Sequence, residues 1–264
     1  MATTAILEEP NHLALRRMQL ELQQAKAEAL KALEQEQELN RLQTEFVSMI
    51  SHDFRTPLTS IQGFAELLHY GDHAITLETR ERYFEKINAS VEHLLFLLDE
   101  VLLIGSVEAG KTIYQPVSTN LEAFCRDLCE SLQLGQENHP VIQISYIGRP
   151  TGKIDKVLLN RILINLLSNA VKYSDQKSKI LFNICCEQDS VTFQIKDEGI
   201  GIPQESLQHL FKTFYRCSNV GQIKGSGLGL AVVKKCVEVY RGEIHLDSQE
   251  GVGTTVTVRL PFLQ

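Results

Sequence analysis

The chain has 264 residues, of which 43% are hydrophobic and 22% are charged, a composition typical of a globular protein with at least one core. Its net charge of −7 argues against a protein that attracts nucleic acid by general electrostatics, so no nucleic-acid partner is expected. No apolar run reaches the roughly 18 residues of a membrane span, and the N-terminus lacks the pattern of a signal peptide.

The six cysteines form no C-x-x-C pair, so neither a zinc site nor a redox motif is indicated. We interpret them as reduced thiols, which are usual in cytosolic proteins, and predict a cytoplasmic protein. They are Cys125, Cys129, Cys185, Cys186, Cys217 and Cys236.

A long helix is predicted after a loose tail over residues 1–12. Between Leu13 and Tyr70, Pro57 and Gly63 are almost the only helix breakers. The heptad-like spacing of the first part is interrupted by "EQEQE" and then resumes, shifted by three residues. Its apolar positions are Leu15, Met18, Leu22, Ala25, Ala29 and Ala32, then Leu39, Leu42, Phe46 and Met49. The pattern fits a plain dimerising coiled coil, or a helix that transmits a signal from an upstream module.

A second helix is predicted over residues 77–108, after a turn at "GDHAIT", residues 71–76. Its apolar residues recur at the 3-4 spacing of an amphipathic helix, at Phe84, Ile87, Val91, Leu94, Leu98 and Val101. Two such helices make an αα-hairpin with one open apolar face. Pairing two hairpins into a dimeric four-helix bundle would bury that face.

After Gly110 the long helical patterns give way to a mixture of predicted strands and helices, so we place a domain boundary near residues 109–112. Strands and helices there need not alternate, which predicts an α/β sandwich and, for the whole chain, an α+β fold. The predicted strands are 112–118, 141–147, 180–187, 191–197, 243–248 and 254–260, and the predicted helices lie near 120–133, 155–173, 203–211 and 228–241. The predicted domains are 1–40, 41–110 and 111–264.

The segment "SHDFRTPLTSI", residues 51–61, carries a histidine, an acid and a proline inside the first helix. At about 100° per residue, His52 lies opposite the centre of the apolar stripe, Thr56 shares its side, and Asp53 lies at the flank. An exposed neutral imidazole is a good nucleophile, and a neighbouring carboxylate can accept its proton. Pro57 frees a backbone carbonyl and can bend the helix. The predicted stripe is Phe46, Ile50, Phe54, Leu58, Ile61, Ala65 and Leu68.

The segment "GSVEAGKT", residues 105–112, matches the phosphate-loop pattern letter by letter. That loop must follow a strand and open a helix, whereas here a helix precedes it and a strand-like run follows. We therefore interpret it as a helix end capped by Gly110, followed by a linker that contains Lys111.

Three segments of the second half suit a nucleotide better. "NLLSNAVKYS" places Asn165 and Asn169 on one helix face, where amide oxygens could bind Mg²⁺. "KDEGIGIP" ends a strand with Asp197, which could accept a hydrogen bond from an adenine amino group. "KGSGLGL" opens a helix with glycines, so bare backbone amides could approach a phosphate.

Together these segments resemble the catalytic core of a two-component sensor histidine kinase. "SHDFRTPLTSI" is similar to the family's H box, "NLLSNAVKYS" to its N box, "DEGIGI" to its first glycine box, "FKTFYR" to its F box and "GSGLGLAVV" to its second glycine box. The resemblance covers about residues 40–264. It implies a homodimer, ATP with Mg²⁺ as cofactors, a mobile lid between the F box and the second glycine box, and a response-regulator receiver domain as partner.

The resemblance also implies residue roles. His52 would accept the phosphoryl group, Asp53 would be its base, and Thr56 would orient water when the partner is dephosphorylated. Asn169, supported by Asn165, would hold Mg²⁺. Phosphates would meet Lys172, Arg216 and Lys224, the ribose side Tyr173, and the adenine Asp197. The remaining cofactor-binding positions in the boxes are Gly199, Gly201, Phe214, Gly225, Gly227, Leu228 and Gly229. The family's commoner H-box acid is glutamate, and Asp53 is a shorter variant.

Two other functions remain open from the sequence. An ATPase of the same superfamily, as in chaperones and mismatch-repair proteins, would pass the phosphate to water. A non-enzymatic dimeric scaffold would not need the nucleotide segments. The H-R-D and D-F-G motifs of serine/threonine kinases are missing.

Overall fold

A computed structural model of the chain describes residues 8–70, 75–108, 114–133, 140–213, 215–221, 223 and 225–262. Some side chains within the first helix, His52 among them, lie outside the described part. The chain divides into two compact units, Met1–His52 and Asp53–Gln264. None of the helices in the described ranges carries an apolar stretch that could cross a bilayer.

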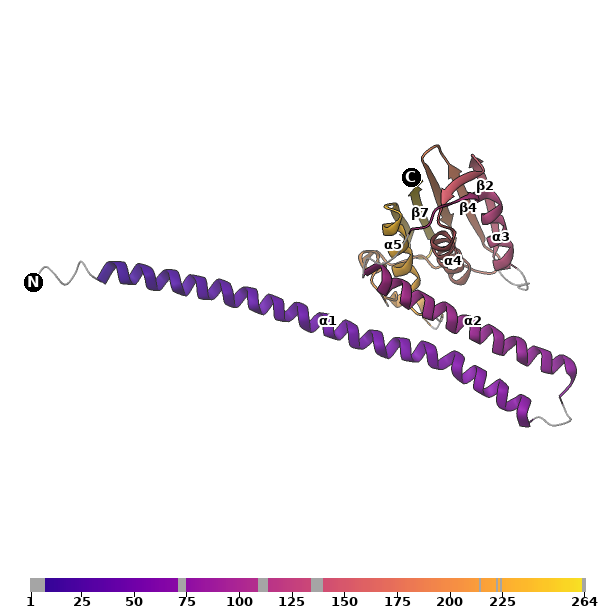
Figure 1. The fold of residues 1–264 in the computed structure, drawn as a ribbon, viewed down its shortest axis with the longest axis horizontal. Helices are drawn as coiled ribbons and strands as arrows, with labels where there is room; N and C mark the ends of the chain where they lie inside the picture. The colour runs from indigo at the N-terminus through magenta and orange to yellow at the C-terminus, as the bar shows by residue number, and fades with distance from the viewer. Residues whose placement is uncertain are drawn as a thin grey trace, which may run out of the picture. The chain divides into compact units, whose positions relative to one another are not determined.

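The two predicted long helices are present as α1, Glu8–Tyr70, and α2, Leu77–Glu108 (Figure 1). Within the second unit they contact each other through Ser90, whose hydroxyl donates to the Ser60 hydroxyl at 3.3 Å, and through the Phe64 and Tyr83 rings, whose centroids are 5.4 Å apart. Helix α1 continues through Pro57. The predicted turn falls partly on residues 71–74, which lie outside the described residues.

The buried face of α1 agrees only in part with the predicted stripe. Ile50, Phe54, Ile61 and Leu68 are half-buried as predicted. Leu58 and Ala65 are exposed, whereas Pro57 is buried and Phe64 is half-buried. The face toward α2 therefore lies one step around the helix from the predicted centre. One hairpin covers only part of the apolar stripe, because a single neighbouring helix cannot enclose a face that wide.

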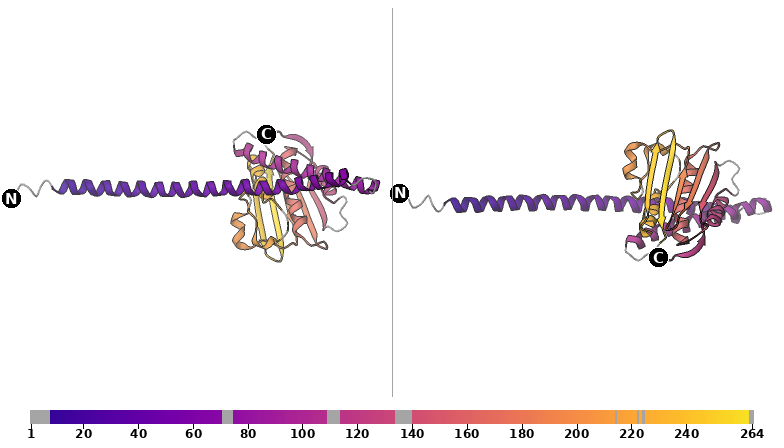
Figure 2. Two further views of the ribbon diagram at one scale, coloured as in Figure 1. Left: turned by 90° about the horizontal axis from the view of Figure 1, so that it is seen from below. Right: turned by 90° about the horizontal axis from the view of Figure 1, so that it is seen from above.

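The second half folds around a five-stranded sheet. Its strands and helices, in chain order, are β1 Val117–Asn120, α3 Leu121–Gln133, β2 Val141–Gly148, β3 Thr151–Ile154, α4 Lys156–Tyr173, β4 Lys179–Cys186, β5 Ser190–Lys196, the short 3₁₀ turns η1 Gln204–His209 and η2 Ser218–Val220, α5 Gly229–Val239, β6 Glu243–Gln249 and β7 Gly253–Pro261. The strand order is β2-β4-β5-β7-β6, with β2 parallel to β4 and the other neighbours antiparallel (Figure 2). Strands β1 and β3 pair separately.

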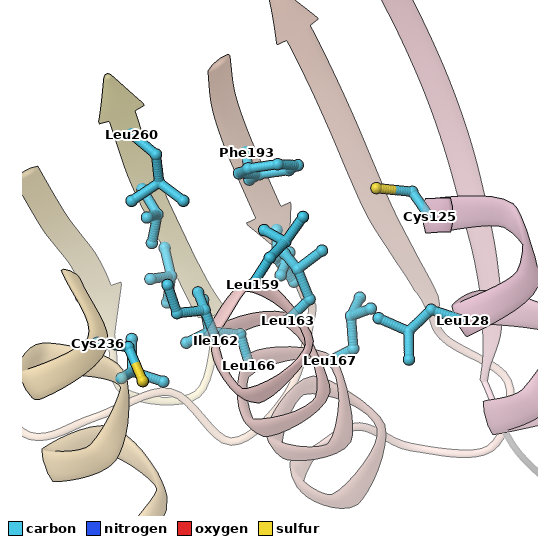
Figure 3. Packing of buried hydrophobic residues seen from close by; sticks show 14 of the residues in the cluster. Cys125, Leu128, Leu159, Ile162, Leu163, Leu166, Leu167, Phe193, Cys236 and Leu260 are labelled. Carbon is cyan, nitrogen blue, oxygen red and sulfur yellow. The ribbon is translucent and has the colours of Figure 1, made fainter. Parts of the chain in front are cut away.

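Alternate residues of β4, β5 and β7 are buried, as expected when a sheet is covered on one face. Helix α4 supplies the centre of the core, where Leu159 and Leu163 lie beneath Phe193 (Figure 3). Helices α3 and α5 complete the helical layer through Cys125 and Cys236, both buried. The helical layer thereby fixes α4 firmly against the sheet, and α4 carries the predicted N box.

Asp155 anchors the start of this half of the chain. Its carboxylate accepts from the backbone amides of Val157 and Leu158, which caps α4, and from the amide of Gln115 at 2.9 Å. The Tyr240 hydroxyl donates to the Asp155 carbonyl at 2.5 Å. Residues just before β1 are thus tied to both α4 and α5.

Three predicted elements need correction. The strand predicted over 112–118 begins only at Val117, and 112–113 lie outside the described residues. Strand β3 was not predicted, because "TGKI" has too few apolar residues to alternate. The helix predicted over 203–211 is only the 3₁₀ turn η1. By contrast, Gly105 lies inside α2, which fits the helix-end interpretation of "GSVEAGKT"; Gly110 and Lys111 lie outside the described residues.

Candidate functional site

The H-box segment lies on α1. The side chain of His52 is outside the described residues, so its predicted exposure stays a prediction. Asp53 is half-buried and Thr56 is exposed, as their positions on the helix predict. Burial and the charge of Arg216 lower the pKa of the Lys172 ammonium on α4, and the charge of Asp53 partly offsets them. The acid of the H box therefore shares an electrostatic environment with the N box.

The inner face of α4 carries Asn165, which is only 6% exposed. Its Nδ2 donates to the Glu100 carboxylate at 2.7 Å and to the Arg161 carbonyl at 3.0 Å. Its Oδ1 faces the start of α5, where a Cβ added to Gly229 would lie 2.5 Å away. Asn169, one turn further along α4, is half-buried. The N box thus directs an amide oxygen toward the second glycine box.

The end of α4 meets the second glycine box at a further point. The Lys172 Nζ lies 4.8 Å from the centroid of the Tyr173 ring, a cation–π contact. A Cβ on Gly225 would lie 2.3 Å from that Nζ. Burial raises the pKa of Tyr173, with Arg216 acting in the opposite direction. A lysine whose ammonium is partly desolvated and that borders a glycine segment is well placed for an anionic ligand.

Asp197 follows β5 directly and is 9% exposed. Its Oδ1 accepts from the amides of Gly199 at 2.9 Å and Thr254 at 3.2 Å. Burial raises the pKa of this carboxyl, while the two backbone hydrogen bonds lower it. The amide of Ile200 donates to the Tyr173 carbonyl at 3.1 Å, so the first glycine box lies beside the end of α4. The carboxylate is held in one orientation.

Glycine is required in the first glycine box by close backbone contacts. A Cβ on Gly199 would lie 2.4 Å from the Tyr173 carbonyl oxygen, and one on Gly201 would lie 2.0 Å from that of Gln249. Gly201 also has a φ of +61°, and Gly227 in the second glycine box has a φ of +69°. Leu228 is 2% exposed and immediately precedes α5.

The segment between the F box and the second glycine box is partly described. The Arg216 guanidinium donates to the Ile223 carbonyl at 2.5 Å, and the Tyr215 hydroxyl donates to Ser206 at 3.0 Å. Phe214 and Lys224, both predicted cofactor-binding residues, lie outside the described residues. Arg216, at the end of the F box, is therefore hydrogen-bonded to a residue just before the second glycine box, and its predicted phosphate contact stays a prediction.

Glu100 was not among the site residues predicted from the sequence. It lies on α2 between Leu97 and Ile104, both buried, at the spacing of a core position, and is itself only 1% exposed. Its position falls outside the predicted apolar repeat, which includes Leu98 and Val101, so the spacing of apolar residues offered no signal. Its partner Asn165 is 65 residues away, so local spacing could not reveal the contact.

Two family models match the chain. Residues 42–110 match the His Kinase A (phospho-acceptor) domain, and residues 154–264 match the histidine kinase-, DNA gyrase B- and HSP90-like ATPase domain. The first match contains the histidine segment, and the second contains strands β4 to β7 of the sheet, α4 and all three nucleotide segments.

Individual proteins show the same likeness. The circadian input-output histidine kinase CikA of Synechococcus elongatus is 36% identical over 242 residues, which is 89% of this chain and 32% of CikA. The structure of Acinetobacter baumannii histidine kinase AdeS has a TM-score of 0.59 at 24% identity and covers 81% of this chain and 98% of that chain, a likeness of fold. Full-length ShkA, in complex with AMPPNP, has a TM-score of 0.57 at 25% identity, covering 82% of this chain and 45% of that chain. The chain spans about a third of the length of the first of these relatives.

Proposed function

Since the chain belongs to the sensor histidine kinases of two-component systems, we propose that it binds ATP in residues 165–229 and transfers the γ-phosphoryl group to His52. The observation that carries this proposal is the meeting of three separate segments: Asn165 faces Gly229, Lys172 borders Gly225, and Asp197 lies beside the end of α4. The division into residues 1–40, 41–110 and 111–264 is part of the proposal, with His52 in the second domain and the nucleotide in the third.

The nucleotide contacts follow from the hydrogen-bonding capacity of each group. Asp197 uses Oδ1 for two backbone amides, which leaves Oδ2 for an adenine amino group. Lys172 offers a cation beside the glycines, and Tyr173 an aromatic side chain. Phosphates would further meet Arg216, Lys224 and the amides of the second glycine box.

Asn169 and Asn165 fit Mg²⁺ as oxygen donors. Both neighbours of the Asn165 Nδ2 are acceptors, so its Oδ1 is the atom that points toward Gly229. Within the described residues, no group of three or more His, Cys, Asp or Glu could hold a metal. A cation here would depend on amide and phosphate oxygens, as Mg²⁺ does beside nucleotides. When bound, it would neutralise charge on the phosphates.

In the transfer step, a ring nitrogen of His52 attacks the γ-phosphorus while the bond to the β-phosphate oxygen breaks and ADP leaves. Asp53 accepts or orients the imidazole proton. The phosphoryl group then passes to an aspartate of a response-regulator receiver domain. Water would replace histidine as acceptor in the alternative, a simple ATPase.

A homodimer is supported by the apolar side chains that the hairpin leaves exposed. Nine of them lie on α1 and α2 in the second unit: Leu58, Leu67, Tyr70, Leu77, Phe84, Val91, Leu95, Leu98 and Leu102. Covering them with a second hairpin would remove this surface from water.

An upstream sensor module would connect through α1. ATP use and free cysteines favour a cytoplasmic location.

Incubation with γ-labelled Mg-ATP tests the proposal. The protein should label itself, and the label should be lost in acid and retained in base, as phosphohistidine is. Phosphate release into solution without any acid-labile phosphoprotein would favour the ATPase instead. Transfer of the label to one member of a panel of receiver domains would identify the partner.

We further propose a phosphatase activity toward the regulator that depends on Thr56. This side chain is exposed and lies one helical turn after His52. Thr56→Ala should leave self-labelling mostly intact and slow the dephosphorylation of the regulator. A variant that loses labelling and keeps the phosphatase activity would contradict this role.

A further inference from the structure

Glu100 is the one carboxylate of α2 that is buried among the described side chains of that helix. It lies against α4, where its Oε1 accepts from the Asn165 Nδ2 at 2.7 Å. The neighbouring Asp99 is 61% exposed and pairs with Arg161 of α4 at 3.4 Å. Two successive acids of the hairpin thus contact the N-box helix, one buried and one at the surface.

The burial of Glu100 has a definite electrostatic cost. Loss of water raises the pKa of this carboxyl, while the hydrogen bond from Asn165 and the charge of Arg161 act in the opposite direction. A leucine would fill such a position without this cost. The carboxylate therefore needs an explanation other than packing.

The contact fixes how the Asn165 amide is turned. The two acceptors around its Nδ2 are the Glu100 carboxylate and the Arg161 backbone carbonyl, and a backbone carbonyl can only accept. The NH₂ group must face them, so Oδ1 must face the opposite way, toward Gly229 at the start of α5. Without Glu100, only one hydrogen bond would hold this orientation.

We propose that Glu100 is a positioning residue that holds the Asn165 amide oxygen ready for Mg-nucleotide, so that the packing of the hairpin helix α2 sets the affinity of the nucleotide site. The inference rests on the proposed function, since it deepens the role given there to Asn165. It makes α2 a carrier of the signal: a movement of α2 that withdraws Glu100 releases the amide and weakens Mg-ATP binding. The two effects are reciprocal, so bound Mg-ATP also favours the packed position of α2.

Calorimetric titration of the full chain with ATP, in Mg²⁺ and in EDTA, separates positioning from structure. Glu100→Ala should weaken binding about five- to thirtyfold in Mg²⁺ and by less than about twofold in EDTA. Glu100→Gln, whose amide oxygen can still accept from Asn165, should remain within about threefold of wild type. Asp99→Ala is the matched control from the same turn and should bind as wild type.

Two further variants keep the test decisive. Glu100→Asp withdraws the carboxylate by one methylene with little loss of volume, and should weaken Mg-ATP as Glu100→Ala does even if the alanine variant folds poorly. In an Asn165→Ala background, Glu100→Ala should cause no further loss.

The inference is overturned if Glu100→Ala and Glu100→Asp bind Mg-ATP like wild type, or if they lose affinity equally with and without Mg²⁺. The second result would indicate a structural role alone. If the wild-type chain bound no ATP at all, the proposed function would fail as well. Wild-type binding therefore distinguishes a failure of the proposed function from a failure of the Glu100 role alone.

Discussion

The hairpin and the sheet-containing half of this chain bury their apolar residues in different ways. Around the sheet, Phe182, Phe193 and Leu163 are fully buried within one continuous core. Along residues 53–108, the described side chains that are buried are Pro57, Leu97, Glu100 and Ile104. The first region encloses its own core, whereas the second leaves an apolar face for a partner. Substitutions in the first should unfold the domain, and substitutions on the second should separate subunits.

The largest effect is expected in the sheet core. Phe193 is fully buried and stacks on Phe182 with the ring centroids 6.3 Å apart. Phe193→Ala should cost about 3–5 kcal/mol of unfolding free energy, because it removes both transfer energy and packing. Denaturant unfolding, followed by nucleotide binding, measures the loss.

The matched hairpin variant is Leu95→Ala, at a side chain that is 57% exposed. It should change the unfolding of the sheet domain by less than about 0.5 kcal/mol and should weaken self-association, measured by sedimentation. If Phe193→Ala and Leu95→Ala destabilised the sheet domain equally, the proposed difference between the enclosed core and the exposed hairpin face would be wrong.

A second contrast separates ligand binding from assembly. Asp197→Asn should weaken ATP about ten- to hundredfold, because hydrogen bonds to charged groups contribute about 1.5–3 kcal/mol. The variant should dimerise normally, since Asp197 lies beside β5 and not on the hairpin. Wild-type ATP affinity by calorimetry would show that the adenine is bound elsewhere.

Two glycines in different surroundings also distinguish the two regions. Gly229→Ala places a Cβ 2.5 Å from the Asn165 Oδ1, whose side chain is held by hydrogen bonds, so a loss of about 1–3 kcal/mol is expected. Gly105 of α2 has nothing within 4 Å of its Cβ position. Gly105→Ala should therefore stabilise the helix by about 0.5–1 kcal/mol. Thermal unfolding measures whether each variant gains or loses stability. Destabilisation by Gly105→Ala would contradict the open space around this glycine.

The smallest effect is expected for Lys111→Ala. If "GSVEAGKT" bound phosphate, this lysine would meet the nucleotide, but the segment begins inside α2. On our interpretation the cation contributes at most about 0.3–1 kcal/mol near a helix end. ATP affinity should change less than about threefold. A tenfold loss of ATP affinity in a folded Lys111→Ala variant would indicate that residues 105–112 bind the nucleotide.

Sequence periodicity predicted the large elements well. The 3.6-residue pattern predicted both long helices and α4, and alternation predicted β2, β4, β5, β6 and β7 within a few residues. Local pattern could not predict β3, whose four residues become a strand only by pairing with β1. It also placed Leu58 on the buried face, because the period of a helix does not say which neighbour covers which part of a wide stripe.

The segments that form the site could be predicted from the sequence, but the contacts between them could not. Motif spacing selected Asn165, Lys172 and Asp197, but not the fact that the Asn165 amide is shared between Glu100 and the start of α5. Such contacts join residues far apart in the sequence, and only the packing of α2 against the helical layer brings them together. Glu100 had no local sign, because it falls outside the predicted apolar repeat that includes Leu98 and Val101.

The central claim is that His52 receives the phosphoryl group from ATP bound in the other half of the chain. Self-labelling of His52→Gln with γ-labelled Mg-ATP, beside calorimetry on the same protein, tests it most directly. We predict that the variant carries no acid-labile label and binds ATP with nearly wild-type affinity. Labelling equal to wild type would contradict the claim and assign the phosphoryl group to another residue.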